Sequence, residues 1–111
     1  LWRLSKFWRG VRNEVPWIDR SPVEIVRDHI RLTAQPFDGP GSAADVQRFM
    51  DLLGSEDLLL FASDFPHWQY EGNAILPDGL SPALRRKIMI DNPRATYPRL
   101  ARSDGGAHAA P

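Results

Sequence analysis

The sequence predicts an α/β fold that is the end of a larger parallel sheet. An alternating apolar and polar segment at 30–34 is followed by a helical pattern at 43–53 and an apolar run at 58–62. This strand, helix, strand order indicates a right-handed parallel unit. Residues 58–62 are apolar on both faces, which is typical of a parallel strand that is covered on both sides. Two strands cannot bury such a run alone, so we expect the chain to need neighbouring strands.

Composition is that of one ordinary globular domain. The chain has 111 residues, 42% of them hydrophobic, and its 14 basic residues balance 14 acidic ones. This balance indicates neither nucleic acid nor a membrane as a partner. The chain has no cysteine, which excludes disulfides and thiolate sites and fits a cytoplasmic location. No apolar stretch approaches the roughly 18 residues of a membrane span. Because residue 1 is leucine, we expect the natural start to lie upstream or to have been removed.

Two helices are predicted before the first strand. A helix over roughly 2–12 has an apolar face that must dock on something, formed by Leu4, Phe7, Trp8 and Val11. Its arginines fit a solvated helix face, with a phosphate contact as the alternative. Ser21 and Glu24 form a capping-box pattern with proline at the first helical position, which predicts a second helix over about 22–28.

Helix-capping residues and prolines predict where the later helices and strands begin and end. Pro36 should end the first strand, whose apolar face is formed by Ile30, Leu32 and Ala34. Ser42 and Gly54 should cap the helix between the strands. A last helix should begin at Ser81-Pro82, be interrupted at Asn92-Pro93 and finish with a turn through Tyr97. From about 103 onward the small and polar residues predict a flexible tail.

The apolar run leads directly into polar residues, "LLLFASDFPHW". In parallel α/β folds the carboxyl ends of the strands face the ligand site, which places Asp64 there. Its carboxylate could ligate a divalent metal or act as a base, or it could cap a turn or a following helix. His67 could be a ligand or a packing residue. Trp68 and Tyr70 could wall a substrate pocket or cover the rim.

Three segments carry a family resemblance: "RNEVPWIDRSPVEIVRDHIRLTAQPFD", "LLGSEDLLLFASDFPHW" and "LRRKIMIDNPRATY". They resemble the C-terminal portion of the metal-dependent amidohydrolases of the amidohydrolase-2 family, relatives of aminocarboxymuconate-semialdehyde decarboxylase and resorcylate decarboxylase. The resemblance covers about residues 7 to 100. The S-D-[FY]-P-H-W block is its most specific element, supported by Asn92 and Tyr97.

The resemblance implies that residues 1–102 form the C-terminal segment of a distorted (β/α)8 TIM-like barrel, with 103–111 as its tail. The strands 30–34 and 58–62 would be the seventh and eighth of that barrel. Asp64 would be the eighth-strand aspartate that binds the metal or acts as general base, and His67 and Trp68 would line the substrate site. The family hydrolyses C–N or C–O bonds or decarboxylates aromatic and unsaturated acids, usually with zinc or manganese.

The other metal ligands of the family have no counterpart in this sequence. The three histidines, His29, His67 and His108, include no His-x-His pair. A catalytic zinc needs about three protein ligands, so we expect that this chain alone neither holds the metal nor is active.

Two function classes stay open. The first is a part of a metal-dependent hydrolase or decarboxylase that acts on a small molecule together with the rest of its barrel. The alternative is a non-catalytic remnant that self-associates through strand edges and the apolar face of the first helix. A nucleic-acid contact through the first helix is a third reading, which the neutral charge disfavours.

Overall fold

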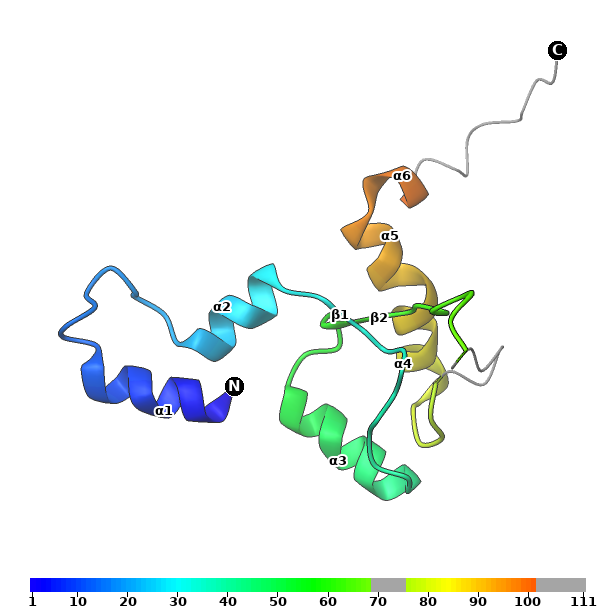
Figure 1. Ribbon diagram of the computed structural model, residues 1–111, viewed down its shortest axis with the longest axis horizontal. Coiled ribbons are helices and arrows are strands. Elements are labelled where there is room, and N and C mark those ends of the chain that lie inside the picture. Colours follow the sequence, from blue (N-terminus) through cyan, green and yellow to red (C-terminus); the bar gives the residue numbers. More distant parts are fainter. Residues whose placement is uncertain (69–75, 102–111) are drawn as a thin grey trace, which may run out of the picture. The chain divides into compact units, whose positions relative to one another are not determined.

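The computed structural model describes residues 1–68 and 76–101. These residues form two compact units, Leu1–Arg31 and the part from Leu32 onward (Figure 1). Tyr70, His108 and the expected tail at 103–111 lie outside the described residues. Within the described part, no helix combines the length and the apolar character that crossing a bilayer requires.

The first unit consists of two helices that contact each other, α1 (Trp2–Val11) and α2 (Pro22–His29). The predicted capping box begins α2. Ser21 Oγ accepts the Glu24 N–H at 3.4 Å, and Glu24 Oε2 accepts the Ser21 N–H at 2.9 Å. The Ser21 hydroxyl also donates to Glu24 Oε2 at 2.7 Å, and the hydrogen bonds that the carboxylate accepts from the Ser21 side chain and backbone lower the pKa of Glu24. Helix α2 therefore starts where the sequence predicts, and it ends one residue later than expected.

The apolar face of α1 is covered only in part. Trp8 is half-buried, and its Nε1 donates to the Ile18 carbonyl at 3.2 Å. Leu4 and Phe7 are each 57% exposed. Within the first unit, Trp8 is thus the residue of the expected docking face that is held by a side-chain hydrogen bond.

The second unit contains the predicted parallel strand pair. Strand β1 (Leu32–Thr33) lies beside β2 (Leu59–Leu60), with Leu32 opposite Leu59 and Thr33 opposite Leu60. The residues from Leu58 to Leu60 are all buried although successive side chains point to opposite faces. This confirms the prediction of a strand that is covered on both sides.

The first strand is shorter than the predicted segment 30–34. The Ile30 N–H donates to the Val26 carbonyl at 2.9 Å, so Ile30 completes the end of α2 instead of opening the strand. Of the expected apolar face, Ile30 and Leu32 are exposed and only Ala34 is buried. The expectation for that face is therefore wrong at two of its three positions.

Helix α3 (Ala43–Leu53) connects the strands and contributes to the core. Ser42 Oγ accepts the Asp45 N–H at 3.2 Å at its start, and Gly54 ends it in the left-handed conformation with φ 61°. The buried core brings together β2, α3, the C-terminal helices, the residue after β1 and a residue of the loop before α4: Leu59, Met50, Leu84, Ile88, Ala34 and Leu76. The loop before the last helices passes close to α3, since a Cβ on Gly79 would lie 2.5 Å from the Ala43 carbonyl oxygen.

The C-terminal helix runs on through the position where the sequence predicts an interruption. It comprises α4 (Pro82–Arg86), a π-helical turn η1 (Lys87–Asp91) and α5 (Asn92–Thr96), followed by α6 (Pro98–Ala101). Figure 1 shows α4 and α5 as one continuous rod beside the strand pair. The predicted interruption is wrong because the π-helical turn η1 carries the helix past Pro93, and the Ile88 carbonyl accepts the Phe61 N–H at 3.0 Å where this proline has no N–H to donate.

Candidate functional site

The segment after β2 forms a tight turn at the carboxyl end of the strand. Asp64 adopts a left-handed conformation with φ 56°, which aspartate tolerates better than most residues. The Phe65–Pro66 peptide is cis, and the His67 N–H donates to the Asp64 carbonyl at 2.7 Å across it. This is the arrangement of a type VI turn. The Phe65 N–H donates to Ser63 Oγ at 3.3 Å.

The Asp64 carboxylate lies beside the imidazole of His67. Asp64 Oδ2 and His67 Nδ1 are 3.3 Å apart, and the two side chains are 42% and 46% exposed. Among the described residues, the carboxylate of Asp64 accepts no backbone N–H, and the hydroxyl of Ser63 holds the turn instead. In the described part of the chain, no hydrogen bond therefore supports the interpretation of the Asp64 side chain as a cap.

Trp68 lies next to His67 at the surface. Their ring centroids are 5.7 Å apart with an interplanar angle of 38°, and Trp68 is 84% exposed. The structure therefore brings Asp64, His67 and Trp68 together on one turn, and it presents all three to solvent. Both alternatives for Trp68, a pocket wall and a rim cover, are compatible with this placement.

A divalent metal can be tested against the donors present. Carboxylate oxygen and imidazole nitrogen both suit zinc or manganese. In residues 1–68 and 76–101, however, no three side chains of His, Cys, Asp or Glu come together to hold a metal ion. Asp64 and His67 are two donors where a catalytic zinc needs about three, so the described residues do not fit a complete metal site.

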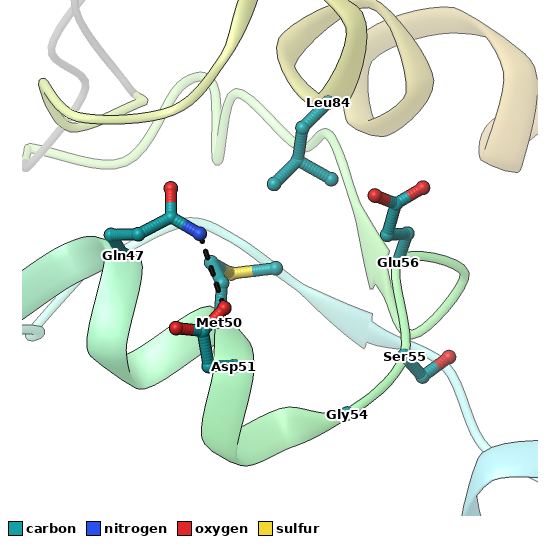
Figure 2. Close-up of a pocket in the computed structure, with 7 residues that line it drawn as sticks. All are labelled: Gln47, Met50, Asp51, Gly54, Ser55, Glu56 and Leu84. Atoms are coloured by element: carbon teal, nitrogen blue, oxygen red, sulfur yellow. Dashed lines mark hydrogen bonds between the residues drawn. The ribbon is translucent and has the colours of Figure 1, made fainter.

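Two pockets lined by described residues of the second unit lie away from this turn. Figure 2 shows the larger one, about 380 Å³, which is lined by α3, Leu84 and the loop that precedes β2. Ser55 and Glu56 from that loop place it at the amino end of β2, opposite the end that carries Asp64. The smaller pocket, about 220 Å³, lies along β1 and the loop after it, where Phe37 packs edge-on against Phe49. Neither pocket includes the residues of the Asp64 turn.

Asn92 is the residue whose role the sequence did not reveal. It is buried, at 5% exposed, and its Nδ2 donates to the Glu56 carbonyl at 2.7 Å and to the Leu59 carbonyl at 2.9 Å. The asparagine before proline was interpreted as a helix stop. An amide three and four residues after Met89 and Ile88, and so on the same helix face as these apolar residues, is the signal that could have indicated a buried hydrogen-bonding role.

Comparison with known proteins relates this arrangement to one family. The family model described as Amidohydrolase matches residues 1–99, which is nearly the whole chain. No curated protein matches the chain significantly. The family generally uses divalent metals and has a barrel fold, and the open two-stranded sheet is consistent with an incomplete barrel. The chain belongs to the amidohydrolase family.

Proposed function

We propose that residues 1–102 are the C-terminal segment of a (β/α)8 barrel in a metal-dependent hydrolase or decarboxylase. In this proposal β1 and β2 are the seventh and eighth strands. The observation that supports it is the position of Asp64, an exposed carboxylate at the carboxyl end of a buried parallel strand. The family match provides the hydrolase-like ancestry.

Asp64 is the group that carries the chemistry in this proposal, as a metal ligand or as the general base. A carboxylate at this place can accept a proton from an attacking water molecule. A zinc or manganese ion bound at this place would lower the pKa of such a water molecule. The remaining ligands come from outside the described residues, since Asp64 and His67 alone do not complete a site.

His67 and Trp68 contact the substrate in this proposal. His67 faces the Asp64 carboxylate and so helps to orient it. The exposed ring of Trp68 offers an apolar surface for a small aromatic or unsaturated acid. The family resemblance is what suggests this substrate class, which includes decarboxylation as well as hydrolysis.

The metal-binding role can be tested with Mn²⁺ on the whole 111-residue chain. Mn²⁺ broadens NMR signals even where it binds weakly, so we expect selective broadening of the amide signals of 63–68 although Asp64 and His67 do not complete a site. Asp64→Asn removes the carboxylate charge and should abolish this broadening. Asp38→Asn, at an exposed loop aspartate, is the matched control and should leave it unchanged. Equal broadening around Asp64 and Asp38 in the unsubstituted chain would contradict the proposal.

A self-associating module is the second candidate. The exposed side chains of Leu4 and Phe7 favour it. Its other premise, that both strands present open edges, is wrong for β2, because Leu59 O and Phe61 N–H are already hydrogen-bonded to the C-terminal helix. Sedimentation at micromolar concentration separates the candidates, since a monomer with a cooperative melt excludes the module.

A further inference from the structure

Strand β2 has an inner edge that is bonded to β1 and an outer edge that faces away from it. On the inner edge Leu32 lies opposite Leu59, and its N–H donates to the Leu58 carbonyl at 2.9 Å. Alternate residues of a strand direct their backbone groups to opposite edges, so Leu59 and Phe61 direct theirs to the outer edge. A parallel strand at that edge would place one residue opposite Leu60. The N–H of that residue would donate to the Leu59 carbonyl, and its carbonyl would accept the Phe61 N–H.

The C-terminal helix supplies both this donor and this acceptor. Asn92 Nδ2 donates to the Leu59 carbonyl at 2.9 Å, and the Ile88 carbonyl accepts the Phe61 N–H at 3.0 Å. The Ile88 carbonyl can accept this bond because the residue five positions later in the π-helical register is Pro93, which has no N–H. A side-chain amide and a backbone carbonyl of the helix thus make the two bonds that one residue of a parallel strand would make.

This mimicry makes the outer edge of β2 exchangeable. In the barrel of the proposed function a neighbouring strand lies at the edge that the helix occupies here. Replacing the helix by that strand leaves the number of bonds to Leu59 and Phe61 unchanged, since a strand residue supplies one donor and one acceptor. We propose that this edge is a docking site for a parallel strand from the rest of the barrel, and that Asn92 and Ile88 close it until that strand replaces them. The identity of the strand rests on the proposed function.

Lys87 provides a contact that can persist through this exchange. Its Nζ lies 2.8 Å from Asp57 Oδ1 and 3.2 Å from Glu56 Oε2, in the segment that precedes β2. These carboxylates lie outside the edge that an incoming strand would occupy, and the flexible lysine stem can follow a movement of the helix. Lys87 therefore keeps the helix attached to the segment before β2 when the bonds to Leu59 and Phe61 are exchanged.

The docking site is tested with the whole 111-residue chain without metal, using a second copy of the chain as the strand probe. Asn92→Ala removes the donor to the Leu59 carbonyl and opens the edge. In sedimentation equilibrium this variant should self-associate about tenfold more tightly than the unsubstituted chain, because an open edge pairs with other strands. Hydrogen exchange locates the contact: the Phe61 amide should exchange more slowly as the variant's concentration rises, whereas the Ala34 amide, bonded to Leu60 on the inner edge, should not change.

Val46→Ala is the matched control, because it truncates a buried side chain on α3 and leaves the edge closed. It should associate no more tightly than the unsubstituted chain. If Asn92→Ala does not fold, Asn92→Ser, which keeps one donor, is compared in the same way. Association of the folded Asn92 variant that does not exceed that of Val46→Ala, or that leaves exchange at Phe61 independent of concentration, would overturn the inference. Because no metal is involved, a failure to bind Mn²⁺ refutes the proposed role of Asp64 without deciding this result.

Discussion

The two halves of the segment 58–68 are held in different ways. The first half, Leu58 to Phe61, is bonded on one edge to β1 and on the other to the C-terminal helix, and its three leucines are buried. The second half, from Asp64 to Trp68, is exposed, and within it the His67 N–H donates to the Asp64 carbonyl. The contacts of the fold are therefore concentrated in the apolar half, and the polar half is presented to solvent. Substitutions in the two halves should therefore affect different properties.

The largest effect is expected in the buried half. Leu58 is fully buried, at 0% exposed, so Leu58→Ala removes packed methyl groups and leaves a cavity. We expect a loss of about 3 kcal/mol in the free energy of unfolding. Urea unfolding measures it, with Leu52→Ala as the control, because Leu52 is an exposed leucine of α3 and should lose far less. Similar losses for the two variants would contradict the description of β2 as a strand covered on both sides.

A smaller effect concerns Lys87, whose Nζ lies 2.8 Å from Asp57 Oδ1 in the segment that leads into β2. Its hydrogen bond to Asp57, and then that to Glu56, raises the pKa of the ammonium group above its ordinary value of 10.5. A raised pKa in the folded state means that this stabilisation is fully present below pH 10.5 and disappears as the pH rises through the folded value.

This pH dependence can be measured against Lys87→Gln, which lacks the charge at every pH. The stability difference between the two proteins should be constant at neutral pH and should shrink above pH 10.5. Because the ion pairs are exposed to solvent and screened by salt, the difference should also fall with added salt. A difference that grows in alkaline solution would contradict the anchoring role of Lys87.

Local sequence patterns predicted the elements whose determinants are local. Ser21 with Glu24, and Ser42 with Gly54, specify their helix ends through neighbours within a few residues, and the apolar run 58–62 specifies a buried strand. The side-chain amide of Asn92 binds carbonyls 33 and 36 residues away. No local pattern contains such contacts, so the asparagine before Pro93 suggested a stop where the structure has an anchor.

The candidate site was likewise predicted from the sequence only in part. The position of Asp64 beyond a buried strand followed from the sequence, because strand direction and the apolar run are enough to place it. The contact between Asp64 and His67 did not follow, because it depends on the left-handed backbone of Asp64 and the turn at Pro66. These backbone conformations are specified by three-dimensional packing as well as by residue type.

The central claim is that Asp64 is a functional carboxylate on an exposed turn that folding does not require. The most direct test of this claim is the Mn²⁺-induced shift in the free energy of unfolding. Without metal, Asp64→Asn and the unsubstituted chain should unfold within about 0.5 kcal/mol of each other, as expected for an exposed side chain. At Mn²⁺ about ten times the dissociation constant of the weak, incomplete site at Asp64, the unsubstituted chain should gain about 1.4 kcal/mol and Asp64→Asn should gain nothing. Equal stabilisation of both proteins by Mn²⁺ would contradict the claim.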